Sequence, residues 1–252
     1  MAIVMTKRST PLQGTKPPRA AVRTRESNRR ESPEARVYDK IHRAITERRL
    51  IPGTRLVEDQ LAEIFKVSRM RIRSVLQALA REKLVTHHKN RGICVAQPTA
   101  KEARDVFAAR RLLEVALARE VVHAIDDKGL KRLRAHIEVE VEAEKGSDWI
   151  KLLRCSLDFH SLLAEIVGNV VITEVLKELL ARSALISAIY ERREISVCSH
   201  FSHAQLIDLL EQRKEQEFAD AMLAHLIEIE GYLALTEKEE APLDLKSVFA
   251  GL

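Results

Sequence analysis

Three histidines stand in separate segments of helical pattern in the second half of the chain. His160 lies within residues 157–165, His203 opens a further segment, and His225 lies in the last long one. Neutral imidazole is a common metal ligand, and three imidazoles together suit Zn²⁺ or Ni²⁺. A single histidine on an apolar helix is more often an ordinary core or surface residue. The metal interpretation therefore requires a fold that brings the three segments together.

Arginines gather at the start of a predicted helix in the first half of the chain. Ser68 is a natural N-cap, and the helix is expected to run to about Glu82. Its apolar stripe consists of Ile72, Val75, Leu76 and Leu79. With this stripe buried, Arg69 and Arg73 lie one turn apart on the outer face, and Arg71 projects nearby. Such a helix fits the DNA major groove, although any one of these arginines taken alone is as well explained as a solvated surface residue.

The segments around this helix predict a helix-turn-helix. Apolar residues recur at helical spacing from Ala35, and the pattern breaks at residues 51–54, Ile-Pro-Gly-Thr. Residues 55–57 are compatible with a short strand, and a second helix is expected over residues 58–65. Residues 66–68 then form the turn before the arginine-bearing helix.

A basic hairpin is predicted directly after the helix-turn-helix. Residues 84–87 and 93–96 have the composition of two strands, joined by the turn Lys-Asn-Arg-Gly at residues 89–92. Arg91 and Gly92 then occupy the tip of a wing, where Arg91 reaches a neighbouring groove or the DNA backbone. Together these elements predict a winged helix-turn-helix over residues 35–98 that binds double-stranded DNA.

The rest of the chain divides into two tails and a helical domain. Residues 1–34 form a basic tail rich in Ser, Thr and Pro, and residues 239–252 form a C-terminal tail. Residues 101–238 predict six or seven antiparallel helices, with breaks near Lys128, Gly146, Gly168 and Glu194. Trp149, the single tryptophan, is expected to pack. The predicted fold class is mostly α: an N-terminal winged helix-turn-helix and a C-terminal antiparallel all-helical bundle.

Composition narrows the class of protein further. The 252 residues include only 8 Gly and 7 Pro, which favours long helices, and the net charge of +5 favours a polyanionic partner. Three isolated cysteines without a CxxC pair are typical of reduced thiols in the cytoplasm. We expect no membrane span and no signal peptide, because no apolar run is long enough.

The first domain resembles the GntR family of bacterial regulators. The matching residues are Leu50 to Leu56, Leu61-Ala62-Glu63, Val67-Ser68-Arg69, Arg73, Leu79, Leu84-Val85 and Arg91-Gly92. The resemblance implies a DNA-binding role for Ser68, Arg69, Arg71, Arg73, Arg91 and Gly92. The family usually has Thr-Pro where this chain has Met70-Arg71, so the operator preference of relatives does not transfer directly.

The second domain resembles the all-helical domain of the FadR-type, or FCD, branch of that family. The matching residues are Phe159-His160, Gly168-Asn169, His203 and His225. In this branch three such histidines and an aspartate hold a divalent metal, and a small carboxylate effector completes the coordination. The aspartate position, four residues before His160, is Ser156 here, and Asp158 points around the helix. The resemblance therefore implies a Zn²⁺ or Ni²⁺ site with weaker or more open coordination, and a metal-free anion pocket is the alternative.

Arg110 and Glu114 also resemble a feature of this branch. They stand at i,i+4 spacing, so Arg110 either pairs with an effector carboxylate or forms an ion pair within its own helix. The effector site implied by the resemblance comprises Arg110, Ser156, His160, His203 and His225.

The leading functional hypothesis is a homodimeric regulator, by analogy a repressor, that binds a palindromic operator under the control of a carboxylate effector. One alternative is a DNA-binding protein without an effector. Another is a three-histidine metal hydrolase, but Asp158 and Glu165 are poor general bases and no HExxH motif occurs. We therefore expect a protein that is not an enzyme.

Overall fold

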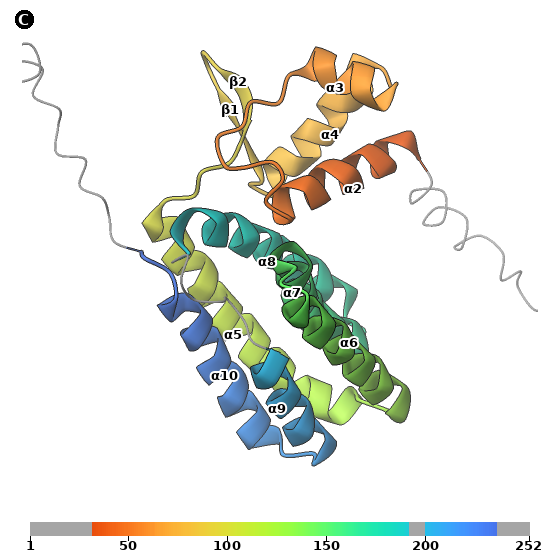
Figure 1. The fold of residues 1–252 in the computed structure, drawn as a ribbon, viewed down its shortest axis with the longest axis vertical. Coiled ribbons are helices and arrows are strands. Elements are labelled where there is room, and N and C mark those ends of the chain that lie inside the picture. The colour runs from red at the N-terminus through yellow and green to blue at the C-terminus, as the bar shows by residue number, and fades with distance from the viewer. Residues whose placement is uncertain (1–31, 192–199, 236–252) are drawn as a thin grey trace, which may run out of the picture.

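The computed structural model describes residues 32–191 and 200–235, which form a small N-terminal unit set across one end of a helical bundle (Figure 1). The N-terminal unit, here called the winged unit, contains three helices and a hairpin. Its elements are α2 (Pro33–Thr46), α3 (Glu58–Phe65), α4 (Arg69–Arg81), β1 (Val85–His88) and β2 (Gly92–Val95).

Local sequence signals fix the limits of the helices in the winged unit. The Ser32 hydroxyl accepts a hydrogen bond from the Ala35 amide, and Pro33 occupies the first turn of α2. α3 ends at Lys66, whose backbone adopts a left-handed conformation with φ of 52°. α4 begins after Ser68, whose hydroxyl accepts from the Arg71 amide, as the sequence predicts. The turn therefore ends one helix and caps the next within three residues.

The wing is a two-stranded antiparallel hairpin in which Val85 pairs with Val95 and His88 with Gly92. Gly92 has a φ of +74°, a conformation that residues with a side chain rarely adopt. Both strands lie one residue from their predicted positions. The strand expected at residues 55–57 is reduced to one bridge between Arg55 and Cys94, which still ties the segment before α3 to the wing.

Six helices form the bundle: α5 (Ala100–Ala124), α6 (Asp127–Lys145), α7 (Trp149–Val167), α8 (Val170–Tyr190), α9 (His200–Glu211) and α10 (Glu215–Gly231). α5 begins with a capping box in which Thr99 and Glu102 bond reciprocally to each other's backbone amides. α7 ends at Gly168, which has a φ of +77°. α5 and α10 run antiparallel, since Arg104 bonds to the Leu235 carbonyl while His123, at the other end of α5, meets Glu215.

The two units share buried side chains through α8. Ala181 and Leu185 of this helix belong to the same apolar cluster as the cores of α2 and α4. Ion pairs from Arg48 to Glu191 and from Arg154 to Glu47 add polar contacts between the units. α8 therefore lies beneath the winged unit and packs against it directly (Figure 1).

Several sequence expectations can be compared with this fold. The bundle helices break at residues 125–126, 146–148 and 168–169, close to the predicted positions. The expectation for Trp149 was wrong: this side chain opens α7 and is 59% exposed. The break near Glu194, the C-terminal tail and nearly all of the N-terminal tail lie outside the described residues. No helix among residues 32–191 and 200–235 is long and apolar enough to cross a membrane.

Candidate nucleic-acid interface and metal centre

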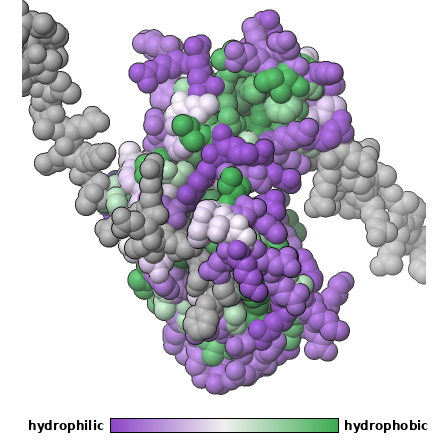
Figure 2. Space-filling model, in the orientation of Figure 1, coloured by the Kyte–Doolittle hydropathy of each residue, from purple (hydrophilic) through white to green (hydrophobic). Residues whose placement is uncertain are grey.

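α4 separates its apolar and basic faces as the sequence predicts. Its four stripe residues, Ile72, Val75, Leu76 and Leu79, are all less than 5% exposed. The side chains of Arg69, Arg71 and Arg73 are about half exposed or more, and they lie outside this stripe. The molecular surface near α3 and α4 is not uniformly polar, because a hydrophobic area lies among the polar residues at that end of the molecule (Figure 2). Met70 is 70% exposed at the start of α4.

Each of the three arginines in the first half of α4 has a carboxylate partner on a neighbouring helix. Nε of Arg69 lies 2.8 Å from Asp59, and Nε of Arg71 lies 2.9 Å from Glu34. Arg73 donates two hydrogen bonds to Glu58, from Nε at 3.1 Å and from Nη2 at 2.8 Å. Sequence reasoning missed these partners, although two adjacent acids at the start of α3 were a visible signal. The basic face of α4 is thus held in place by acidic residues.

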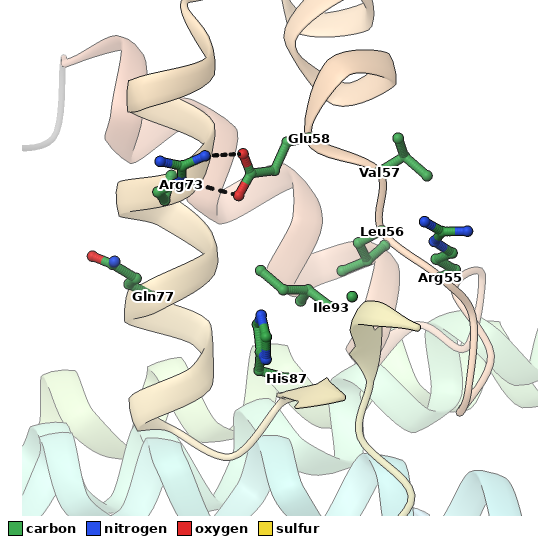
Figure 3. Close-up of a pocket in the computed structure, with 9 residues that line it drawn as sticks. Arg55, Leu56, Val57, Glu58, Arg73, Gln77, His87 and Ile93 are labelled. Atoms are coloured by element: carbon green, nitrogen blue, oxygen red, sulfur yellow. Dashed lines mark hydrogen bonds and ion pairs between the residues drawn. The ribbon is translucent and has the colours of Figure 1, made fainter. Parts of the chain in front are cut away.

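A hollow of about 370 Å³ lies between α4 and the wing (Figure 3). Leu56 and Ile93 supply apolar lining, and Arg73 and Gln77 line it from α4. The remaining lining residues are Arg55, Val57, Glu58, His87 and Gly92. Gly92 therefore borders this hollow, and the preceding residue, Arg91, is exposed.

The bundle brings the three predicted histidines together. His160 of α7, His203 of α9 and His225 of α10 each offer a ring nitrogen, and these atoms lie within 4.8 Å of one another. All three side chains are buried. Nε2 of His203 lies 3.2 Å from Nε2 of His225. Two nitrogens bound to one tetrahedral Zn²⁺ at ~2.0–2.1 Å stand about 3.3 Å apart, so this spacing, which is also that of a hydrogen bond between two imidazoles, is compatible with a metal site.

Buried carboxylates lie behind two of the histidines. Nδ1 of His203 contacts both oxygens of Glu140 on α6, at 3.0 and 3.1 Å. Nδ1 of His160 lies 2.5 Å from Oε2 of Glu114 on α5, at an angle too poor for a regular hydrogen bond. A carboxylate that accepts a hydrogen bond from the Nδ1–H group leaves the lone pair of Nε2 directed to the other side of the ring. This arrangement orients His203 toward His225.

The electrostatics of this cluster favour ionised carboxylates in Glu114 and Glu140 and neutral imidazoles in His160 and His225. Burial would raise the pKa of Glu114, but Arg110 and His160 outweigh it and lower the pKa below its usual range. Burial likewise opposes the hydrogen bonds from His136 and His203 that lower the pKa of Glu140. Burial lowers the pKa of His160 despite the opposing effect of Glu114, and burial together with the neighbouring His203, His160 and Arg110 lowers the pKa of His225. Neutral imidazole is the form that binds a metal.

Arg110 forms the predicted intrahelical ion pair, and the pair is buried. Nε of Arg110 donates to Glu114 at 2.6 Å, and both side chains are 2% exposed. Nη1 approaches the Ser183 hydroxyl at 3.4 Å, whereas Nη2 has no hydrogen-bond partner among the described residues. Arg110 therefore pairs with Glu114 and still has donor capacity for an anion.

Ser156, one turn before His160, borders a small cavity together with Arg110. Its other lining residues are Phe107, Leu153, Leu157, His160, Ser183, Ser187 and Ile229. The cavity has a volume of about 10 Å³, which accommodates about one water molecule. A larger ligand must therefore displace the surrounding side chains or helices.

The donor set fits a divalent metal without an aspartate. Three imidazole nitrogens suit Zn²⁺ or Ni²⁺, and a fourth position remains for a ligand other than protein. Both ring nitrogens of His160 lack a regular hydrogen bond within the described part of the chain although the residue is 1% exposed. Such an unsatisfied buried polar group calls for a missing partner. Asp158 is absent from the histidine cluster, as its helical position predicts.

Glu140 was the residue that sequence reasoning missed at this site. It is 1% exposed, and it also lies 3.4 Å from His136, one turn earlier on α6. The visible signal was this His-Glu pair on the buried side of a helix. His200, three residues before His203, is a weaker candidate ligand by sequence, and its side chain lies outside the described residues.

Comparison with known proteins assigns the family. Residues 33–95 match bacterial regulatory proteins of the gntR family, and residues 105–228 match the FCD domain. The chain belongs to the GntR family of transcriptional regulators, and its two domains are consistent with the FadR-like branch. This family consists of regulators rather than enzymes, so the hydrolase alternative is set aside.

Individual relatives carry related descriptions. The Nta operon transcriptional regulator of Aminobacter aminovorans is 28% identical over 69% of this chain and 82% of its own length. The HTH-type transcriptional repressor NanR of Cronobacter sakazakii is 26% identical over 81% of this chain and 87% of its own. The transcriptional regulator YdhC of Bacillus subtilis is 28% identical, but the match covers 52% of this chain and 59% of YdhC.

Solved structures share the fold. A putative GntR regulator from Rhodococcus sp. RHA1 matches with a TM-score of 0.71 and 24% identity, over 79% of this chain and 95% of that one. Escherichia coli McbR/YncC matches with a TM-score of 0.69 and 16% identity, over 79% and 94%. These likenesses support the architecture of a winged domain joined to a helical domain.

Proposed function

We propose that this regulator is a homodimeric repressor whose affinity for a palindromic operator is controlled by a small carboxylate bound in the helical domain. The winged domain over residues 35–98 binds the DNA, and residues 101–238 bind the effector and form the dimer. The observation that carries the proposal is the buried cluster of His160, His203 and His225 beside Arg110, whose Nη2 has no hydrogen-bond partner among the described residues. Since a DNA operator lies inside the cell, we expect the protein to act in the cytoplasm.

The DNA-binding half of the proposal assigns α4 to the major groove. Arg69, Arg71 and Arg73 supply exposed guanidinium groups that can bind guanine at two points or contact phosphates. Ser68 begins the helix that carries them, and Arg91 and Gly92 at the wing approach the adjacent groove. A palindromic operator follows from two-fold symmetry, because two copies of α4 then meet two equivalent half-sites.

The effector half assigns one end of the ligand to Arg110. A carboxylate oxygen accepts from Nη2 of Arg110, and the hydroxyl groups of Ser156 and Ser183 line the same cavity. His160, His203 and His225 would hold a Zn²⁺ or Ni²⁺ ion, which when bound supplies a Lewis-acid position for a second oxygen of the effector. Glu114 and Glu140 orient two of these imidazoles.

The experiment that tests the metal is elemental analysis of the purified, tag-free protein beside two variants. His203→Ala removes a buried histidine of the cluster. His123→Ala removes an exposed histidine, whose side chain is 69% exposed. We expect about one metal ion per chain in the wild type and in His123→Ala, and a loss in His203→Ala.

Equal metal content in all three proteins would contradict the metal assignment. No metal in the wild type would favour a pocket in which the histidines bind an anion directly. Titration of carboxylates into a complex with operator DNA then tests the effector. Release of DNA by a chelating carboxylate supports the proposal, whereas affinity that ignores every carboxylate indicates DNA binding without an effector.

A further inference from the structure

The contact between Arg73 and Glu58 differs in geometry from the other ion pairs of α4. Arg69 and Arg71 each approach a carboxylate through Nε, whereas Arg73 uses both Nε and Nη2 (Figure 3). Glu58 is also the less exposed acid, with 26% of its side chain accessible compared with 57% for Asp59. Two parallel hydrogen bonds fix the plane of a guanidinium group, which a single contact does not.

We propose that Glu58 is a positioning residue that holds Arg73 in the orientation needed to recognise a guanine in the operator. The inference rests on the proposed function, in which α4 lies in the major groove. It adds a residue of α3, outside the recognition helix, to those that determine which sequence is bound.

The chemistry of the guanidinium group explains how one carboxylate can do this. Arg has five N–H donors in a planar fork. With Nε and one hydrogen of Nη2 directed to Glu58, the outer edge still carries the hydrogens of Nη1 and the second hydrogen of Nη2. Nη1 of Arg73 has no hydrogen bond to another described residue. Two adjacent donors on that edge match the O6 and N7 acceptors of guanine, which is the commonest specific contact of arginine in DNA.

Preorganisation explains why the pair is useful. A free arginine side chain has many rotamers, and a loose guanidinium can exchange a guanine for a phosphate. A side chain already held by a second residue loses less freedom on binding and presents its donors at one place. Glu58 is itself placed by the first turn of α3, which adjoins the hollow lined by Arg73 and Gln77.

The competing interpretation is that Glu58 masks Arg73. A carboxylate near the DNA surface repels phosphates, so its removal would then strengthen binding to every sequence alike. Positioning therefore predicts that the removal of Glu58 weakens the preference for guanine, whereas masking predicts that this preference stays unchanged.

The test uses the full-length protein and an operator selected by the wild type from random DNA. Binding is measured by fluorescence anisotropy at fixed salt for the operator and for single-base changes, and the position most sensitive to Arg73→Lys identifies the base read by Arg73. At that position we expect Glu58→Gln to reduce the preference for guanine about tenfold or more. Glu63→Gln is the matched control, because it removes the same charge from an exposed residue of the same helix that does not contact the arginines of α4. We expect it to leave the guanine preference unchanged.

A double variant, Glu58→Gln with Arg73→Lys, supplies the second arm. If Glu58 acts through Arg73, the double variant discriminates no less than Arg73→Lys alone. Additive losses would overturn the inference, as would a Glu58→Gln protein that keeps its guanine preference while binding all sequences more tightly. A wild type that selects no sequence would remove the proposed function as well, so the two failures are distinguishable.

Discussion

Arginine–carboxylate pairs occur in two very different environments of this protein. On α4 the pairs are exposed to water, and their partners come from α2 and α3. In the bundle Arg110 and Glu114 are buried, and Glu114 also lies against His160. Water screens the first set, so the pairs contribute little to stability and their donors remain available to DNA. The second set cannot lose a partner without leaving a charge in the protein interior. Under the proposed function, the same chemical pair would serve DNA recognition in one domain and the effector site in the other.

The largest expected effect is on the buried pair. Glu114→Gln leaves the Arg110 guanidinium uncompensated, and we expect it to lower the free energy of unfolding by about 3–5 kcal/mol. Denaturant unfolding of the metal-free protein, with chelator present, measures the loss. Glu58→Gln serves as the exposed counterpart and should unfold close to the wild type. Equal losses in the two variants would break the comparison.

The next effect concerns DNA affinity without a loss of structure. Arg73→Ala and Arg69→Ala should weaken operator binding, by roughly five- to a hundredfold where a two-point base contact is lost. Because both side chains lie outside the apolar stripe, circular dichroism should show unchanged helix content. Ile72→Ala is the contrasting variant, since it truncates a fully buried side chain and should destabilise the winged domain by about 2–5 kcal/mol. Unfolding of either arginine variant would show that the exposed pairs are structural after all.

A third effect sharpens the role of the buried acids. Glu140→Gln weakens the acceptor behind His203, so we expect metal affinity to fall about 10- to 100-fold. Competition with a chromogenic chelator measures it directly. Glu138→Gln, an exposed change on the same helix, is the control and should bind metal as the wild type does. If Glu140→Gln bound metal normally, its contact with His203 would serve packing alone.

The smallest effect tests an exposed contact that is not an ion pair. Ser68→Ala removes the hydroxyl that caps α4, a hydrogen bond of 3.4 Å to the Arg71 amide. We expect a loss of about 0.5–1 kcal/mol in the free energy of unfolding. Thermal denaturation should register a small shift, far below that of Glu114→Gln. A loss as large as that of Glu114→Gln would mean that solvent exposure does not determine how much a polar contact contributes to the free energy of unfolding.

The elements of both domains were predictable because their signals are local. The stripe from Ile72 to Leu79, the Ser68 cap and the turn before Gly92 each depend on residues close in sequence. The histidine site needed the family resemblance, because helical periodicity does not say which helices meet. Glu140, and the contact of Glu114 with His160, were not predicted for the same reason, since they depend on how α5 and α6 pack against α7 and α9.

Trp149 is a residue whose exposure was predicted wrongly from the sequence. A large aromatic side chain is usually well buried, yet here it stands at the exposed start of α7. Its exposure depends on where the first turn of α7 lies in the bundle, and the residue type alone does not give that position.

α8 contributes residues both to the small cavity and to the core of the winged domain. Ser183 and Ser187 border the small cavity, while Ala181 and Leu185 pack into the core of the winged domain. Residues 181–187 span about 9 Å at 1.5 Å per residue, so a ligand that displaced Ser183 or Ser187 would displace the contacts of Ala181 and Leu185 with the winged domain by a similar amount. In a dimer both winged domains would move, and a change in their spacing would alter how well they fit two half-sites about 34 Å apart on the DNA.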